Sequence, residues 1–309
     1  MHVSVVVCTH TTDRYPYLRR AVDSVLDGSY DDREVVLVSD GSPAVAERAR
    51  EEYGDRSDVR VLELAENRGL LGARNAGARA AEGEVVAFVD DDAVADERWL
   101  AELVRVYEEE RIDGREPVAA GGRMTPLWVA GEPAYLPEEF YWLVGVTHRG
   151  FADGAGEVRN TPGSNISFRR EAFLELDGFN TDIGGRKGDN HLQGGETELC
   201  ARLRSEYGMG VYYTPQAEVA HKVFRYRTRP GWLLRRAFWQ GYSKRAMSVL
   251  VPESAGEEGA FLSRLLGEFI PERLRSLEPS YPAVAQLLAL VVLTGVVGLG
   301  YAYGTLRWR

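Results

Sequence analysis

The 309-residue sequence is poor in cysteine, and its acidic residues outnumber its basic ones. Two cysteines cannot form a disulfide framework, and we expect Cys8 and Cys200 to fill buried apolar space. The 47 acidic residues exceed the 37 basic ones and give a net charge of −10, which argues against nucleic acid as a partner. The N-terminus lacks the composition of a signal peptide, so we expect the globular part to be cytosolic.

Long uncharged stretches are also scarce, with one exception near the C-terminus. Residues Ala283–Gly304 contain no charged side chain. As a helix this segment would be about 33 Å long, enough to cross a hydrocarbon core of roughly 30 Å. Three arginines shortly before the segment, against two after it, favour a cytoplasmic position for the globular part. The segment predicts attachment to the cell membrane, with a buried helix of a soluble core as the alternative.

The first 124 residues alternate between apolar strand patterns and helical patterns, which predicts an α/β fold with a mostly parallel, Rossmann-like sheet and helices on both faces. Ser42 and Pro43 are typical of the first positions of a helix. The predicted strands cover 2–8, 34–39, 59–64, 84–90 and 118–124, and the predicted helices cover 17–26, 43–53, 70–81 and 97–110.

Beyond Thr125 the pattern is less regular. We expect an irregular stretch over 125–160, a long glycine-rich loop over 178–195, short strands over 165–169, 211–214 and 218–222, and helices over 171–176, 196–206 and 232–250. The last helix combines a basic face with bulky apolar residues, which fits either a membrane surface or a core helix with a solvated basic side. The predicted domains are a catalytic domain over 1–225 (nucleotide-binding half 1–124, acceptor half 125–225), amphipathic membrane-surface helices over 226–280, and a transmembrane segment over 281–309.

Polar side chains follow three of the predicted strands at the sheet edge where ligands bind in such folds. These residues are Thr9, Asp40 and the run Asp90, Asp91 and Asp92. A G-x-G-x-x-G turn and a P-loop are both missing, which disfavours a dinucleotide site and a P-loop nucleotide site. Three adjacent carboxylates in a cleft repel one another and favour a bound cation such as Mg²⁺ or Mn²⁺. The alternative is an acidic surface turn.

Five stretches in fixed order resemble family 2 inverting glycosyltransferases of the A-type fold, over residues 3 to about 222. Within that family the sequence is most similar to archaeal membrane-associated enzymes that extend a dolichyl-phosphate-linked sugar. The resemblance implies a UDP-sugar donor, a lipid-linked saccharide acceptor and a role in glycan assembly for protein N-glycosylation. Glucuronic acid is one candidate sugar, and Arg186 or Lys187 could contact its carboxylate. The five stretches are VSVVVCTH, VLVSDGS, ENRGLLGARNAGARAAEGEVVAFVDDDAVAD, GSNISFRREAFLELDGF and GGETELCARLR.

The same resemblance implies roles for individual residues. Ser39 occupies a position where many members have a second aspartate beside Asp40, which makes the contact to the nucleotide base less certain to transfer. A helix N-terminus near Gly69 and an arginine on that helix are candidates for the diphosphate. The implied nucleotide-binding residues are Thr9, Asp40, Arg74, Asp90 and Asp91, and the implied metal ligands are Asp90, Asp92 and His221.

Inversion requires a base that removes the proton of the acceptor hydroxyl. Aligned on GGETEL, the base is Glu196, with Gly195 where the family has a second acid, so the sequence departs from the family at both positions. Glu198 is the second candidate for the base, and Ser164, Asn165 and Glu198 are expected to contact the sugar or the acceptor. The alternative for the two glutamates is favourable placement at a helix N-terminus.

Three functions therefore remain open from the sequence. The first is metal-dependent transfer of a sugar to a lipid-linked acceptor at the cytoplasmic face of the membrane. The second is transfer to a non-lipid acceptor, with the C-terminal segment as an anchor. The third is a catalytically inactive scaffold subunit that binds a sugar nucleotide, which the departures at Gly195 and Glu196 would permit.

Overall fold

A computed structural model describes residues 1–183, 192–252, 257–275 and 280–308. The chain divides into two compact units. The first unit comprises Met1–Thr125, Gly154–Gly185 and Gly195–His221, and the second comprises Pro126–Asp153, Arg186–Gly194 and Lys222–Arg309. The predicted domain boundaries near 225 and 280 remain predictions.

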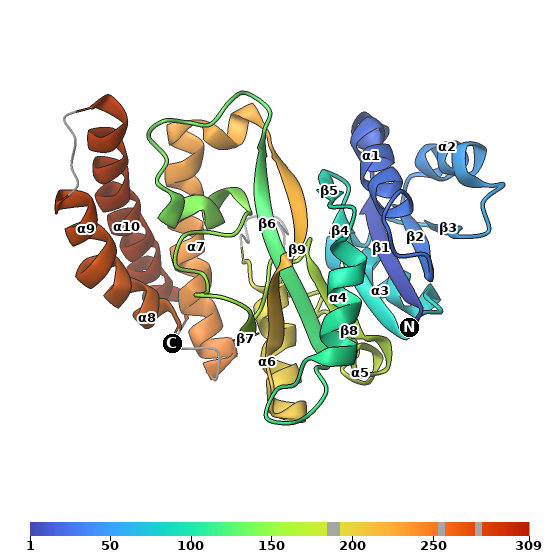
Figure 1. Ribbon diagram of the computed structural model, residues 1–309. Coiled ribbons are helices and arrows are strands. Elements are labelled where there is room, and N and C mark those ends of the chain that lie inside the picture. Colours follow the sequence, from blue (N-terminus) through green and yellow to red (C-terminus); the bar gives the residue numbers. More distant parts are fainter. Residues whose placement is uncertain (184–191, 253–256, 276–279, 309) are drawn as a thin grey trace. The chain divides into compact units, whose positions relative to one another are not determined.

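The first unit is built on a sheet whose central strands are parallel (Figure 1). Strands β1 to β4 are apolar and buried at the centre because helices cover both faces, as the continuous apolar runs predicted. Cys8 pairs with Asp90 and Thr9 with Ser39, so the carboxyl ends of three strands meet at one edge. The bounds are β1 (Val3–Thr9), β2 (Arg33–Asp40), β3 (Val59–Leu64) and β4 (Val85–Asp90).

Five further strands extend the sheet, in the order β3-β2-β1-β4-β8-β6-β9-β5, with β7 paired to β9. Two predicted short strands over 211–214 and 218–222 are one continuous strand, because the fixed φ of Pro215 is compatible with extended backbone. The sequence analysis missed β5, which is too short to show a periodic pattern. The bounds are β5 (Ala93–Ala95), β6 (Ala119–Trp128), β7 (Gly156–Val158), β8 (Ile166–Arg169) and β9 (Val211–Val223).

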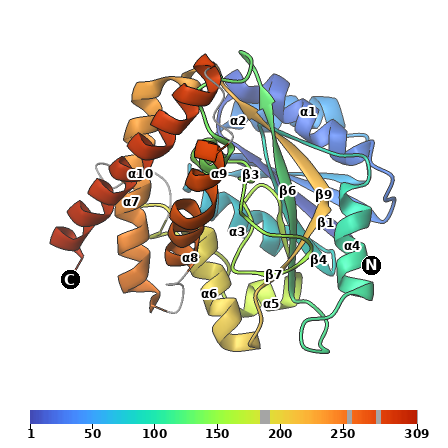
Figure 2. The ribbon, with the colours of Figure 1, turned by 60° about the vertical axis from the view of Figure 1, so that its left-hand side comes forward.

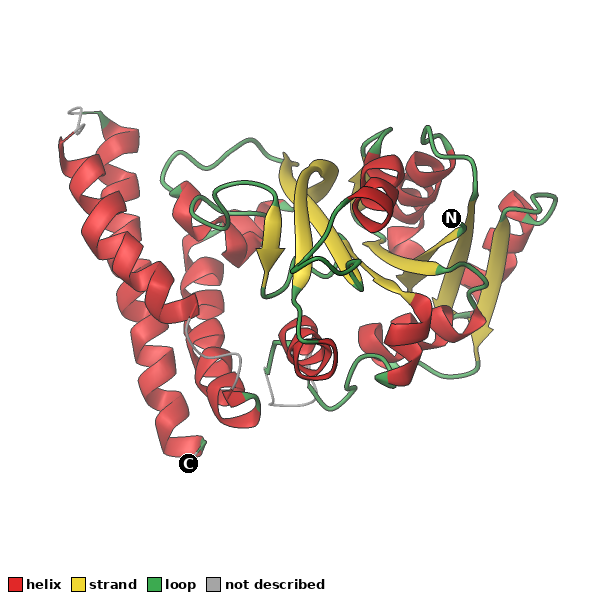
Figure 3. Cartoon of the chain, turned by 60° about the horizontal axis from the view of Figure 1, so that its bottom comes forward, coloured by secondary structure: helices red, strands yellow, loops and turns green. Residues whose placement is uncertain are grey.

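Helices cover both faces of this sheet, as Figure 3 shows. Val5 and Val7 pack toward α1, α2 and α4, whereas Val6 and Cys8 point the opposite way, toward α3, α5 and α6. Ser42 is the N-cap residue of α2, but its side chain makes no capping bond, and only its carbonyl is used. The bounds are η1 (Thr12–Arg14), α1 (Tyr15–Leu26), α2 (Pro43–Tyr53), α3 (Gly69–Ala80), α4 (Trp99–Glu109), α5 (Arg170–Glu175) and α6 (Gly195–Tyr207).

The second unit is mainly helical, and its two longest helices, α7 and α10, pack side by side (Figures 1 and 2). Gly241 of α7 and Gly300 of α10 allow close contact, because a Cβ at either position would lie within about 2 Å of a backbone oxygen of the other helix. The 3₁₀ turn η2 lies within the stretch predicted to be irregular. The bounds are η2 (Glu138–Val144), η3 (Arg225–Thr228), α7 (Pro230–Leu250), α8 (Glu257–Arg264), η5 (Leu265–Phe269), α9 (Ile270–Arg275) and α10 (Tyr281–Arg307).

Among the described residues, α10 is the one helix that is long and apolar enough to cross a membrane. It contains the uncharged segment that the sequence analysis singled out, extended by two residues toward the N-terminus and three toward the C-terminus. Only 17% of its most apolar stretch is buried, which disfavours the alternative of a fully buried core helix.

Candidate active site

The last residue of β4, Asp90, lies where this strand reaches the edge of the sheet. Its carboxylate accepts a hydrogen bond from Arg74 Nη2 at 2.6 Å. Its backbone N–H donates to the hydroxyl oxygen of Ser164 at 2.8 Å, so Ser164 fixes the strand end. The side chain of Asp90 is partly exposed, whereas Arg74 is buried. Asp90 therefore presents its carboxylate toward solvent while a buried cation holds it from below.

The next two aspartates are buried and share one arginine. Arg14 donates to Asp91 Oδ1 at 2.7 Å and to Asp92 Oδ2 at 2.6 Å. The hydroxyl of Thr9, at the end of β1, donates to Asp91 Oδ2 at 2.6 Å. Burial raises the pKa of Asp91 to about 6, although Arg14 and the Thr9 hydroxyl act in the opposite direction. These contacts place Thr9 as a support for the acidic run.

His221 joins this group through the pairing of β5 with β9. Ala93 pairs with His221 in that ladder, and His221 Nε2 lies 3.2 Å from Asp92 Oδ1. One ligand atom from each of Asp90, Asp92 and His221 lies within 4.8 Å of the others. Two carboxylates and an imidazole are a donor set that suits Mn²⁺ and accepts Mg²⁺ through its oxygens. The residues implied as metal ligands are thus brought together and fit a divalent cation.

Arg74, on α3, connects this group to Glu196, at the start of α6. Its Nη1 lies 3.1 Å from Glu196 Oε1, while its Nη2 binds Asp90. Burial alone would lower the pKa of Arg74, but the carboxylates of Asp90 and Glu196 raise it above its usual value. Glu196 is 28% exposed, so its carboxylate is accessible to a substrate. Candidate metal ligands and candidate base are therefore separated by one guanidinium.

Gly163 makes room for this arrangement. A Cβ at this position would lie 2.0 Å from Glu196 Oε1 and 2.7 Å from Arg74 Nη1. Any larger residue would therefore displace the carboxylate of Glu196, because the buried guanidinium of Arg74 has little space to move.

Asp40, at the end of β2, is buried and binds the loop that leads into α3. Its Oδ1 accepts a hydrogen bond from the backbone N–H of Arg68 at 2.7 Å. Gly41 has a φ of +69°, and a Cβ there would lie 2.3 Å from the backbone nitrogen of Asn67. Asp40 therefore shapes the loop before α3, and its expected contact with the nucleotide stays a prediction.

Two other predicted residues are engaged in contacts within the first unit. Asn165 is buried; its Oδ1 accepts from Trp99 Nε1 at 2.9 Å, and its Nδ2 donates to the carbonyls of Arg123 and Ala217. Both amide protons of Asn165 are therefore used to join strands and a helix. Glu198 is also buried, and it binds Arg202 through both carboxylate oxygens at 2.7 and 2.9 Å. The structure thus places neither side chain with the Arg74 group.

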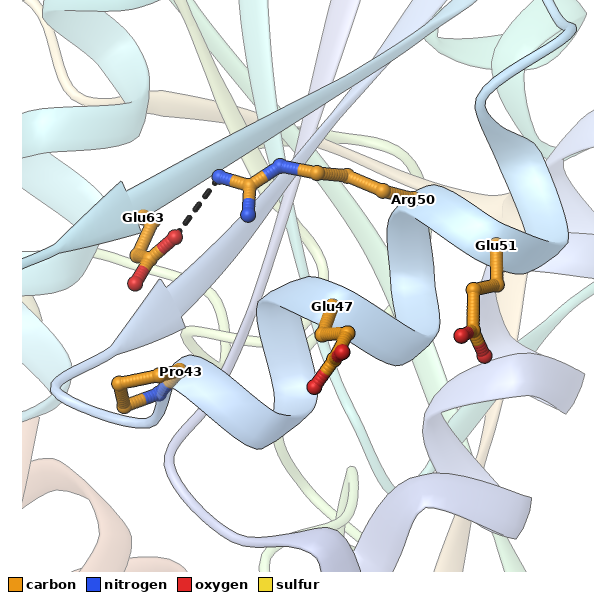
Figure 4. A pocket seen from close by; sticks show the side chains of 5 residues that line it. All are labelled: Pro43, Glu47, Arg50, Glu51 and Glu63. Atoms are coloured by element: carbon orange, nitrogen blue, oxygen red, sulfur yellow. Dashed lines mark hydrogen bonds and ion pairs between the residues drawn. The ribbon is translucent and has the colours of Figure 1, made fainter.

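Sequence reasoning missed Arg14, although its position in the segment after β1 was a usable signal, since the loops at this edge line the site. Residues 186 and 187, expected to contact a sugar carboxylate, lie outside the described residues. A separate open hollow of about 530 Å³ lies beside α2 and β3 (Figure 4). Three glutamates and one arginine line it, a charge balance that would repel a diphosphate.

Comparison with known proteins identifies the family. Residues 4–177, more than half of the chain, match the model of glycosyl transferase family 2. The chain belongs to this family. Over 308 residues it is 46% identical to glucosyl-dolichyl phosphate glucuronosyltransferase of Haloferax volcanii, covering 99% of this chain and 97% of that protein. The predicted family and its activity as a glycosyltransferase are confirmed.

Solved structures of glycosyltransferases share the fold. A mannosyltransferase from Pyrobaculum calidifontis in complex with GDP-Man and Mn²⁺ aligns with a TM-score of 0.59 at 19% identity, over 98% of this chain and 87% of that one. TarS of S. aureus, residues 1–349 in complex with UDP, aligns with a TM-score of 0.54 at 16% identity, over 100% and 89%. The predicted A-type fold is confirmed. One of these structures contains Mn²⁺ and the other UDP, and the chain described here has an acidic group that could hold a cation.

Proposed function

We propose that this enzyme transfers glucuronic acid from UDP-glucuronic acid to glucosyl-dolichyl phosphate, with inversion at the anomeric carbon. The observation that carries the proposal is the 46% identity to the Haloferax volcanii enzyme, which extends over nearly the full length of both chains. The grouping of Asp90, Asp92, His221, Arg74 and Glu196 in one unit supports it, because these residues supply the groups that such a transfer needs.

In this proposal Asp90, Asp92 and His221 hold Mn²⁺ or Mg²⁺. When bound, the cation neutralises negative charge on the departing UDP. Arg14 and Thr9 keep the acidic run in place: Arg14 binds Asp91 and Asp92 together, and Thr9 binds Asp91. Because these carboxylates are positioned before substrate arrives, little reorganisation is required during the reaction.

Glu196 is the proposed general base. Among the described residues only its Oε1 is hydrogen-bonded, to Arg74, which leaves Oε2 for the acceptor hydroxyl. The hydroxyl oxygen attacks the anomeric carbon as the bond from that carbon to UDP breaks. UDP leaves with the electron pair, and the hydroxyl proton passes to Glu196. Attack from the face opposite UDP inverts the configuration.

The proposed location is the cell membrane, with the catalytic part on its cytoplasmic side. The apolar helix α10 supports attachment to the membrane, and a dolichyl-linked acceptor would itself be embedded in a bilayer. The predicted surplus of arginines before this helix supports the cytoplasmic side.

The test is transfer of radiolabelled sugar from UDP-glucuronic acid to glucosyl-dolichyl phosphate by the full-length protein in detergent, with and without Mn²⁺. We expect Glu196→Gln to lower turnover about 10²- to 10⁴-fold while UDP binding persists. Asp92→Ala should also abolish the stimulation by Mn²⁺. Glu51→Gln, an exposed change on α2, serves as the control and should leave turnover unchanged.

Two results would refute the proposal. Unchanged transfer by both Asp92→Ala and Glu196→Gln would remove these residues from the chemistry. Transfer from a different UDP-sugar to the same lipid, with none from UDP-glucuronic acid, would refute the donor while leaving the base and the metal ligands intact.

A further inference from the structure

Helix α10 has two sides of different character along its whole length. On one side Leu290, Leu293, Gly300 and Gly304 are buried against the rest of the second unit. The opposite side forms an aliphatic stripe with spacings of three, four and eight residues, as one face of a helix requires. The stripe residues, which are 42–70% exposed, are Val284, Leu288, Val291, Leu299 and Leu306.

The buried side is attached to polar groups near the start of the helix. Gln286 accepts from Arg273 Nη1 at 2.9 Å and donates to the carbonyl of Ala134 at 3.1 Å. The same arginine binds both carboxylate oxygens of Glu139, which is fully buried. The first turns of α10 are therefore joined to an ion pair on α9 and η2.

The second half of α10 is joined to α7, a helix with basic side chains. Gly241 faces Val297, and Arg245 packs its Cβ against Gly304 while its Nη2 donates to the carbonyl of Trp308 at 3.2 Å. The contacts advance together along both helices, so α7 runs beside α10 in the same direction from Val297 onward.

These attachments leave too little free length for a crossing. Between Gln286 and Val297 the helix rises about 16 Å, roughly half the thickness of the hydrocarbon core. A transmembrane α10 would thus draw into the hydrocarbon either the Glu139–Arg273 ion pair or the arginine-bearing part of α7, and charged groups are costly there.

We infer that α10 does not span the bilayer but lies along its surface, with the aliphatic stripe inserted among the acyl chains of one leaflet. Its chemistry matches such a surface. The stripe carries no charge, Arg307 and the exposed Tyr301 border its C-terminal end, and Tyr281 is exposed at its N-terminal end. Aromatic rings and arginines favour the headgroup region that would surround an in-plane helix. This inference replaces the predicted transmembrane segment and is independent of which sugar the enzyme transfers.

Cysteine labelling distinguishes the two arrangements. Tyr281→Cys and Arg307→Cys place thiols at the two ends of α10, and Glu51→Cys marks the first unit; the natural Cys8 and Cys200 are buried and serve as a background control. Sealed vesicles of single orientation that contain the full-length protein are treated with a maleimide that cannot cross membranes. We expect all three positions to react from the same side of the membrane. Reaction of positions 281 and 307 from opposite sides would overturn the inference.

A second measurement tests the occupant of the stripe. We expect Leu288→Glu and Leu299→Glu each to reduce co-flotation with vesicles of anionic archaeal-type lipids by about tenfold or more, because each introduces a charge among acyl chains. Leu70→Glu, an exposed aliphatic position on α3, is the matched control and should float as the wild type does. Unchanged flotation of both stripe variants would overturn the inference, as would a wild-type protein that ignores vesicles and instead forms a dimer that the stripe variants cannot form.

Discussion

The Gly163→Ala substitution tests the placement of Glu196 with a single methyl group. The new Cβ would lie 2.0 Å from Glu196 Oε1, whereas ordinary contact needs about 3.4 Å, so the carboxylate must move by roughly 1.4 Å. Arg74 is too deeply buried to yield instead. A displacement of about 1 Å in a catalytic group costs on the order of 10²-fold in rate, so we expect turnover to fall by about that factor.

The fold should tolerate this substitution, since the obstructing atom is the end of a flexible side chain. Stability should change by less than about 1 kcal/mol, because alanine also restricts the unfolded chain. The assay is steady-state transfer of labelled sugar together with thermal unfolding. Gly154→Ala is the matched control, as no atom lies within 4 Å of its added methyl. A folded Gly163→Ala enzyme with turnover within twofold of the wild type would refute the placement of Glu196 as the base.

Three further predictions follow from contacts in the two units. Arg14→Gln leaves two buried aspartates without their shared cation, so the metal-free protein should lose about 2 kcal/mol of stability, and Mn²⁺ should raise the melting temperature more than in the wild type. Glu198→Gln should lower the melting temperature while turnover stays within about threefold, because this carboxylate binds an arginine outside the Arg74 group; a loss of turnover like that of Glu196→Gln would contradict this assignment. Burial lowers the pKa of His148 from its usual 6.5 to about 4, so the unfolded chain binds the proton more tightly and stability should fall as the pH drops from 6.5 to 4. Urea unfolding of His148→Phe should lack this dependence, and an identical pH profile in both proteins would show that His148 is not its source.

The sequence predicted the parts of the fold that depend on burial of regular segments. The apolar runs over β1, β2 and β4 indicated strands covered on both faces, and the residues after them indicated the site, because parallel strands end at one edge. Glu196 was found through the family resemblance alone, since a glutamate at a helix start has an ordinary structural explanation.

Other parts depended on contacts between distant segments. The contact between His221 and Asp92 requires the β5–β9 pairing, and β5 has too few residues for a recognisable pattern. Asn165 has the right residue type for a sugar contact, but its amide protons bind two carbonyls that only the folded chain brings near. The Arg14 contacts join positions that are 77 and 78 residues apart, which periodicity does not report.

The bonds of Arg74 set the spacing between the two halves of the reaction. Its two terminal nitrogens belong to one planar, delocalised group with no rotatable bond between them, and each holds a different carboxylate. The distance from Asp90 to Glu196 is therefore governed by covalent geometry rather than by the packing of α3 against α6. A lysine in its place would offer a single point of charge, so the leaving-group side and the attacking side of the substrate would lose their common ruler.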